Sequence, residues 1–136
     1  MPYFTNKNIR PWRMLEACRI LAWLLAATIV VLSLVPATLR PESGAPHDFE
    51  HFVIFAATGL AFGLGYGPRY PIAMGLVIFA GAIEVAQLFV PGRHARLSDF
   101  IVDAFAACIG FLASYVVARK LEVTTFGPEF PRHQGD

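Results

Sequence analysis

Two carboxylic acids interrupt the long apolar stretches of this chain. Glu84 is the only charged residue in 70–92, and Asp103 is the only charged residue in 100–118. A charged carboxylate that faced lipid would cost about 2.5 to 3.5 kcal/mol on insertion scales. We therefore expect both side chains to face the interior of a helix bundle and to have polar partners there.

Polar side chains that could serve as these partners occur close by in the sequence. Gln87 follows Glu84 at i+3, and Asp99 precedes Asp103 at i−4, so each pair shares one face of a helix. Arg93 lies in the loop between them, and its planar guanidinium can bind a carboxylate or a phosphate through two parallel hydrogen bonds. The predicted cluster comprises His51, Glu84, Gln87, Arg93, Asp99 and Asp103.

Anion recognition is the positive role that best fits these residue types. His94 and Arg96 accompany Arg93 in one short loop, and the N-terminus of the following helix lies beside them. In a membrane protein the obvious anion is a lipid headgroup or a lipid-linked precursor. The alternative is an ordinary solvated basic loop, which suits Arg96 better than Arg93.

General acid–base catalysis is a second use of the same groups. His51, Glu84 and Asp99 are candidate catalytic residues, because imidazoles and carboxyls transfer protons. No nucleophile elbow, P-loop or acidic phosphatase motif accompanies them, and Ser98 is better explained as a helix cap. Catalysis therefore stays open, beside a third interpretation in which the buried polar contacts only hold the helices together.

A metal site is conceivable on the two histidines at the start of the second apolar stretch. His47 and His51 lie one helical turn apart, and Asp48 or Glu84 could add an oxygen ligand. The segment lacks the HExxH order of zinc-binding helices. We therefore predict neither a bound metal nor a cofactor.

The elements that must position these side chains are membrane helices. Hydrophobic residues make up 56% of the 136 residues and charged residues only 15%, against about 25% in an average soluble domain. The mean hydropathy is +0.54, which argues against both a disordered chain and a solvated enzyme domain. A formal net charge of +1 argues against nucleic-acid binding, which needs a basic excess.

Four stretches are long and apolar enough to cross a membrane, since a spanning helix needs about 20 mostly apolar residues. They are 20–39, 51–68, 70–92 and 100–118. The sequence therefore predicts an all-α, four-helix transmembrane bundle. We expect Pro91 and Gly92 to end the third helix, and Ser98 or Asp99 to cap the fourth.

Charge placement divides the chain and predicts its orientation. We expect a basic interfacial arm at 1–19, a four-span membrane domain at 20–118 and a mobile cytoplasmic tail at 119–136. Most of the 11 Lys and Arg residues lie in the arm, the tail and the turn after the second span, so both termini should be cytoplasmic. The polar cluster then faces outward. The alternative for the first span is a cleaved signal peptide, although no clean A-x-A site follows it.

Two stripes of small residues are typical of closely packed membrane helices. Gly59, Gly63 and Gly67 recur at every fourth position, as do Gly110 and Ser114. This spacing lets two helix backbones approach closely. We interpret both stripes as contacts within the bundle, while the first could instead serve a homo-oligomer or another membrane-protein partner.

Several of the polar residues stand at spacings that match a known signature. The run EVAQLFVPGR at 84–93 is followed by LSD at 97–99 and by Gly110. This pattern resembles the E-x-x-Q-x-x-x-P-x-R…S-x-x-D/N signature of the VanZ-like family, except that Ser98 and Asp99 are adjacent here, and HFVIF at 51–55 resembles its H-F-x-x-F/Y segment. The resemblance covers roughly 32–111.

The resemblance also has departures. His47 and Asp48 stand where the family often has Asp and Lys, and Asp103 and Ala106 where it often has Asn and Gly. The family implies a small integral membrane protein of the bacterial inner membrane, named for a member linked to glycopeptide (teicoplanin) resistance, and no settled activity. The functional positions that it implies are His51, Glu84, Gln87, Arg93, Ser98 and Asp99.

Together these observations predict an integral membrane protein of the cell envelope. We expect it to bind an anionic lipid or a lipid-linked envelope precursor through Arg93, with Glu84, His51 and Asp99 setting the geometry and protonation of the pocket. One alternative is a membrane-embedded hydrolase or transferase that acts on such a lipid. The other is a structural or assembly protein with no catalytic site.

Overall fold

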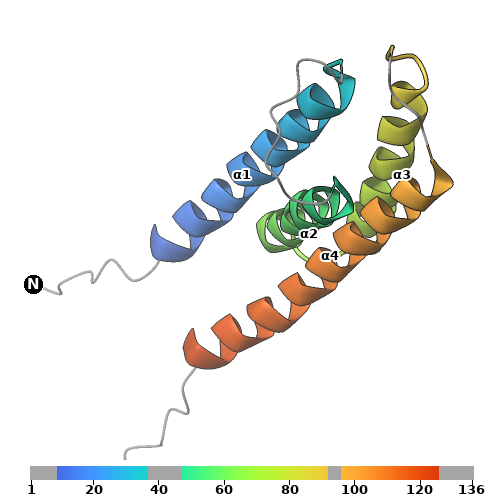
Figure 1. The fold of residues 1–136 in the computed structure, drawn as a ribbon. Helices are drawn as coiled ribbons and strands as arrows, with labels where there is room; N and C mark the ends of the chain where they lie inside the picture. Colours follow the sequence, from blue (N-terminus) through green and yellow to red (C-terminus); the bar gives the residue numbers. More distant parts are fainter. Residues whose placement is uncertain (1–8, 37–46, 92–95, 126–136) are drawn as a thin grey trace, which may run out of the picture.

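The computed structural model describes residues 9–36, 47–91 and 96–125, and within them it contains four helices and no strand. The helices are α1 (Ile9–Leu34), α2 (His47–Tyr66), α3 (Tyr70–Gln87) and α4 (Leu97–Thr125) (Figure 1). Each is long and apolar enough to cross a membrane. The predicted all-α, four-helix class is confirmed, and the four helices indicate a multi-pass membrane protein.

The outer helices extend beyond the predicted spans. Residues 9–19, predicted as part of an arm, form the beginning of α1, and residues 119–125, predicted as part of a tail, form the end of α4. The charges in these segments show where the apolar stretch ends, but a helix bonds its own backbone and can continue into a polar environment. The remainder of the predicted arm and tail, 1–8 and 126–136, lies outside the described residues.

The third helix is shorter than predicted. It ends at Gln87 instead of reaching Pro91, and the chain continues in a turn whose N–H groups bond to carbonyls three residues back. These bonds are Leu88 to Val85 at 3.2 Å, Phe89 to Ala86 at 3.1 Å and Val90 to Gln87 at 3.1 Å. Tighter bonds of this kind satisfy carbonyls at the end of a helix. Glu84 and Gln87 consequently lie in the last turn of α3.

The fourth helix starts before the predicted caps. The N–H groups of Asp99 and Phe100 donate to the Arg96 carbonyl, at 2.9 and 3.3 Å, and α4 begins at Leu97. Ser98 and Asp99 therefore lie inside the first turn, and the prediction that one of them is the N-cap is wrong. An acid in the first turn still complements the positive end of the helix dipole.

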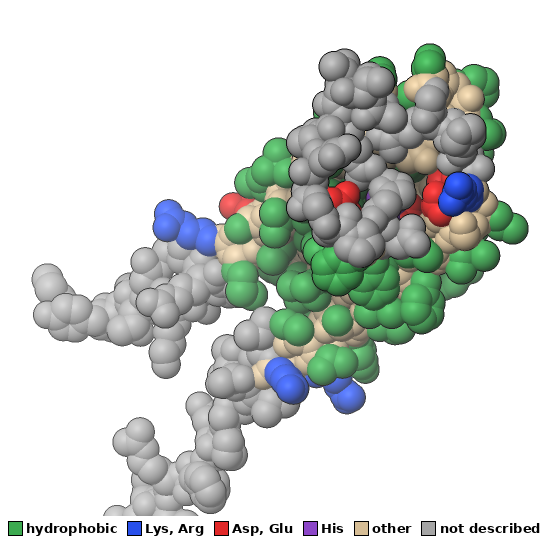
Figure 2. All heavy atoms as spheres, in the orientation of Figure 1, with side chains coloured by type: hydrophobic (Ala, Val, Ile, Leu, Met, Phe, Trp, Pro, Cys, Tyr) green, Lys and Arg blue, Asp and Glu red, His purple; other side chains and the backbone are tan. Residues whose placement is uncertain are grey.

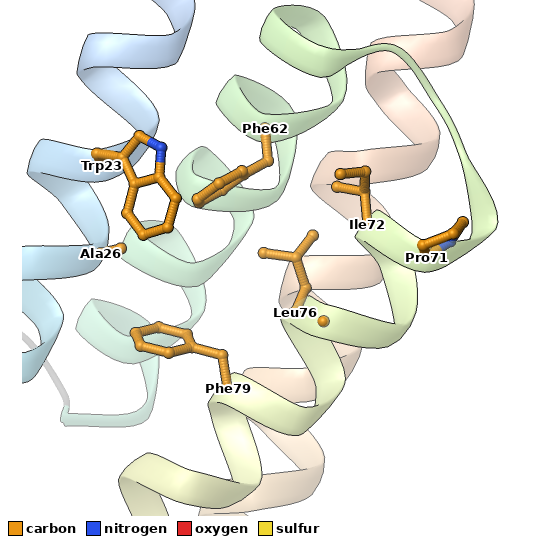
Figure 3. A pocket seen from close by; sticks show the side chains of 8 residues that line it. Trp23, Ala26, Phe62, Pro71, Ile72, Leu76 and Phe79 are labelled. Carbon is orange, nitrogen blue, oxygen red and sulfur yellow. The ribbon is translucent and has the colours of Figure 1, made fainter.

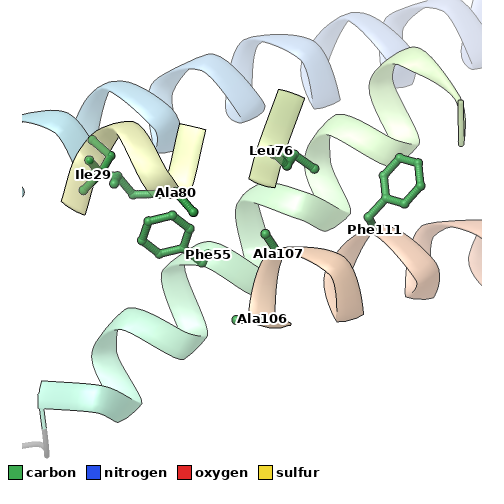
Figure 4. Packing of buried hydrophobic residues seen from close by; sticks show 8 residues of the cluster. Ile29, Phe55, Leu76, Ala80, Ala106, Ala107 and Phe111 are labelled. Atoms are coloured by element: carbon green, nitrogen blue, oxygen red, sulfur yellow. The ribbon is translucent and has the colours of Figure 1, made fainter. Parts of the chain in front are cut away.

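The second helix is the centre of the bundle. It packs most extensively against α4 and next against α1, whereas α3 lies mainly along α4 and touches α1 only sparsely (Figure 1). The buried apolar core joins all four helices, and Figure 4 shows Phe55 of α2 beside Ile29 of α1 and Ala80 of α3. Its other members are Leu76, Ile83, Ala106, Ala107 and Phe111.

Small residues let α2 and α4 approach closely. A Cβ atom added at Gly59 would overlap the Ala107 carbonyl, and one added at Gly63 would overlap the Ser114 hydroxyl. Both glycines are therefore used within the chain, as predicted for contacts inside the bundle. Gly67 is not helical: it lies in the turn after α2 with φ +80°. A partner chain would have to use residues other than Gly59 and Gly63.

The outer surface of the helices is apolar. Large side chains such as Ile78, Phe105 and Leu112 are more than half exposed, and Figure 2 shows apolar side chains over much of the visible face. Soluble monomers rarely expose contiguous apolar patches of more than a few hundred Å². Such a surface suits lipid contact, which agrees with the length and composition of the helices.

Candidate functional site

A buried ion pair joins the two helices that pack most closely. His51 is in the first half of α2, and Asp103 is in the second turn of α4. The Nδ1 atom of His51 lies 3.1 Å from each carboxylate oxygen of Asp103. The two residues are 8% and 1% exposed. A carboxylate that accepts the Nδ1 proton fixes the orientation of the ring, so the pair can serve as an oriented acid–base group or as a packing contact.

Glu84 connects the end of α3 to the start of α4. One of its carboxylate oxygens accepts a hydrogen bond from the backbone N–H of Arg96, the residue before α4. Its other oxygen, Oε2, is buried and has no hydrogen-bond partner among the described residues. The loop between the two helices is therefore tied at one end through the main chain, and half of the carboxylate is left for another group.

Gln87 presents a second unpartnered polar atom in the same turn of α3. Its side chain is 3% exposed, and its Nε2 atom is buried without a hydrogen-bond partner among the described residues. A buried polar group without a partner costs about 1 to 3 kcal/mol. Glu84 Oε2 can only accept a hydrogen bond when ionised, and Gln87 Nε2 can only donate one. Together they offer a ligand one acceptor and one donor.

The described part of the site is acidic. Glu84 bonds the residue before α4, Asp99 lies in the first turn of α4, and Asp103 lies one turn later against His51, so the four side chains lie at one end of the bundle. Ser98 donates a hydrogen bond to Asp99 Oδ1 at 3.0 Å at the exposed rim. Three carboxylates accompany one imidazole in this group. A ligand that enters it should therefore present hydrogen-bond donors to the carboxylates.

The structure brings some of the predicted site residues together and does not describe others. The structure brings together His51, Glu84, Asp99 and Asp103, and it places Gln87 in the same turn as Glu84. Arg93 and His94 lie outside the described residues, and so does any Glu84–Arg93 pair. Arg96 is exposed and contacts Glu84 through its backbone N–H, not its guanidinium.

The structure describes only some of the candidate metal ligands that the sequence offers. His47 begins α2, but its side chain and that of Asp48 lie outside what the structure describes. Among the described side chains, no group of three or more His, Cys, Asp or Glu residues is arranged to hold a metal ion.

A group of polar contacts at the opposite end of the bundle is not predicted by the sequence. Arg19 Nε donates to the Gly65 carbonyl at 2.8 Å, and Trp23 Nε1 donates to the Tyr66 hydroxyl at 2.8 Å. The Arg19 guanidinium carbon lies 5.2 Å from the centroid of the Tyr66 ring. Arg19 was assigned to the basic arm by its charge, and the only signal for this contact was the i, i+4 spacing of Arg19 and Trp23.

Comparisons of the chain with protein-family models, with curated proteins and with solved structures gave no match. The fold and the site geometry therefore carry the functional argument. Their main elements are a buried His–Asp pair, a carboxylate that ties α3 to α4, and two buried polar atoms without a partner.

Proposed function

We propose that this chain is a VanZ-like protein of the bacterial inner membrane that binds the headgroup of an anionic lipid or a lipid-linked envelope precursor. The observation that carries the proposal is the pair of unpartnered buried atoms, Glu84 Oε2 and Gln87 Nε2. Buried polar groups in native proteins nearly always have a partner, so a ligand that supplies the missing one explains both atoms.

In this proposal, different residues bind two different parts of the ligand. Hydroxyl or amide groups of the headgroup donate to the Glu84 carboxylate and accept from Gln87, as a sugar can. The anionic part binds the arginines of the loop between α3 and α4, which are Arg93 and Arg96. Of these the structure describes Arg96, whose side chain is exposed next to the N-terminus of α4.

Charge placement supports an outward-facing site. Arg13 and Arg19 lie toward the N-terminal end of α1, and Arg119 and Lys120 lie toward the C-terminal end of α4. Cytoplasmic segments of membrane proteins are enriched in Lys and Arg. With that end of the bundle in the cytoplasm, the polar site opens toward the outer leaflet, where the resemblance to a family linked to glycopeptide resistance leads us to expect an envelope lipid.

A second candidate function rests on the His51–Asp103 pair. A histidine held through Nδ1 by a buried carboxylate is oriented for general acid–base chemistry at its other ring nitrogen. In this alternative the protein is a hydrolase or transferase that acts on the bound lipid. It requires turnover that disappears in His51→Gln while lipid binding persists.

Gln87→Leu separates ligand binding from folding. Leucine has a similar volume and removes the unpartnered donor, and replacing an unsatisfied buried polar group by an apolar one is neutral or stabilising. We expect unchanged or higher thermal stability, together with loss of the lipid that co-purifies with the wild type. Mass spectrometry of protein extracted in native-lipid particles measures the lipid, and thermal melting measures the stability.

The matched control is Val85→Leu, which places the same side chain at an exposed position of the same helical turn. It should retain the wild-type lipid profile. If Gln87→Leu keeps both its stability and its lipid, Gln87 does not bind the headgroup. If it loses stability instead, the polar group is part of the packing and the structural alternative is favoured.

A further inference from the structure

An apolar cavity lies between α1 and α3, at the half of the bundle opposite the polar site. It has a volume of about 240 Å³. Figure 3 shows its lining, with Trp23 from α1 on one side, Ile72, Leu76 and Phe79 from α3 on the other, and Phe62 of α2 between Trp23 and Leu76. An apolar cavity of about 150 Å³ suffices to bind benzene in a soluble protein. This cavity therefore has room for a segment of hydrocarbon chain.

The position of the cavity matches one leaflet of a bilayer. Its lining on α3 runs from Pro71, next to the first residue of the helix, to Phe79. At 1.5 Å per residue this distance is roughly 12 Å, close to half of the approximately 30 Å hydrocarbon thickness. The cavity thus follows the depth that an acyl chain occupies in the leaflet next to the turn between α2 and α3.

Cationic and aromatic groups stand at the interfacial end of the cavity. Trp23 lines the cavity and bonds Tyr66, and Arg19 lies one turn earlier on α1, over the Tyr66 ring. Of the five N–H donors of its guanidinium, the structure assigns the one on Nε to Gly65. The donors of the terminal nitrogens have no acceptor among the described residues and can bind a phosphate. Arg69, exposed at the N-terminus of α3, adds a second positive charge two residues from the cavity lining.

We propose that this cavity holds one acyl chain of an anionic glycerophospholipid, whose phosphate is bound by Arg19 and Arg69. The apolar lining accepts the chain, and the two arginines complement the negative headgroup. Trp and Tyr side chains are enriched at headgroup depth, where Tyr66 and Trp23 connect the two parts of the site. This site is separate from the polar cluster at the other end of α3 and does not depend on the function proposed for that cluster.

Fluorescence quenching of Trp23 tests the proposal directly. The chain has two tryptophans, so a Trp12→Phe background leaves Trp23 as the only reporter. The protein is reconstituted in phosphatidylcholine vesicles that contain increasing fractions of either dibrominated phosphatidylglycerol or dibrominated phosphatidylcholine. We expect phosphatidylglycerol to quench at a mole fraction lower by a factor of about five or more, since a single basic group near an anionic surface already implies about fivefold.

Two variants and two controls separate the parts of the site. A Cβ at Gly75 meets no atom within 4 Å, so Gly75→Leu adds a large side chain to the cavity lining without a clash at its Cβ and should abolish the preference for phosphatidylglycerol. Arg19→Gln should weaken it, because only Arg69 then carries a positive charge at the site, whereas Arg19→Lys, which keeps the charge, should retain it. Ala27→Leu, at an exposed position beside the cavity wall, should behave as the wild type.

Three results would overturn the proposal. Equal quenching by the two brominated lipids in the wild type shows that Trp23 contacts bulk lipid only. A preference that survives Gly75→Leu shows that the chain does not enter the cavity. Insensitivity of Trp23 to both lipids shows that a protein surface, such as a second copy of this chain, covers the groove.

Discussion

Gly110→Ala is expected to lower the stability by about 3 kcal/mol or more, the largest loss of any glycine-to-alanine change among the described residues. A Cβ at position 110 would overlap the carbonyl oxygen of Ala56 and also approach the backbone nitrogen of Leu60. Overpacking a well-packed core typically costs 1 to 3 kcal/mol, and here the obstacle is backbone, which cannot change rotamer. The methyl group must therefore push α4 away from α2.

The matched control for this variant is Gly75→Ala on α3. A Cβ at Gly75 meets no atom within 4 Å, and alanine stabilises the interior of a helix by roughly 0.5 to 1 kcal/mol relative to glycine. Denaturant titration of both variants in the same detergent, followed by circular dichroism, measures the difference. Equal stabilities of the two variants would show that α2 and α4 do not approach as closely at Gly110 as the structure places them.

Asp103→Ala is expected to have the second largest effect, because it removes the buried carboxylate that His51 Nδ1 contacts. The Asp103 carboxylate is 1% exposed and lies 3.1 Å from His51 Nδ1. Removing one member of a buried ion pair costs about 3 to 5 kcal/mol in soluble proteins. Contacts between membrane helices are weaker, with coupling energies of about 0.6 kcal/mol on average and up to about 1.7. We expect a loss of about 3 kcal/mol, of which about 1 to 2 is pairwise coupling.

A double-mutant cycle with His51→Ala, Asp103→Ala and the double variant separates these two contributions. Asp103→Asn is the conservative comparison, because its amide oxygen can still accept the Nδ1 proton. It should retain most of the stability. Additive losses in the cycle would mean that the two side chains do not interact in the folded protein, and would remove both the acid–base and the packing interpretation of the pair.

The effects of Gly110→Ala and Asp103→Ala are linked, because both residues are on α4. Gly110 lies two helical turns after Asp103 on α4, on the side that packs against α2. A displacement of α4 at Gly110 therefore also disturbs the distance between His51 and Asp103. Lipid that is lost in Gly110→Ala but retained in Gly75→Ala would show that the polar site depends on the spacing of the two helices.

Much of the fold was predictable because it depends on the free energy of single side chains in lipid. The absence of charge identifies four spans, and the cost of a lipid-facing carboxylate predicts that Glu84 and Asp103 face inward; they are 7% and 1% exposed. The helix ends were predicted less well. Pro91 marks the turn after α3, but the helix ends at Gln87 because tighter hydrogen bonds take over before the proline.

The partners within the candidate site were not predictable. Spacing along one helix shows which residues share a face, yet it says nothing about the neighbouring helix opposite that face. The sequence predicts a cluster that contains Glu84 and Arg93, and Arg93 lies outside the described residues; the partner of Glu84 that the structure describes is the backbone N–H of Arg96, a group that every residue except proline carries. No side-chain pattern can identify such a donor.

By itself, then, the sequence determined the class of the protein, the number of its spans and the inward facing of two carboxylates. These properties follow from the transfer of each residue into lipid, which depends on residue type and local order. The tertiary structure decided the His51–Asp103 pair, the unpartnered atoms of Glu84 and Gln87, and the cavity beside Trp23. These features depend on how each helix is rotated about its axis and on how closely the helices approach one another. Contacts between residues far apart in the chain, such as Ala56 against Gly110, establish both.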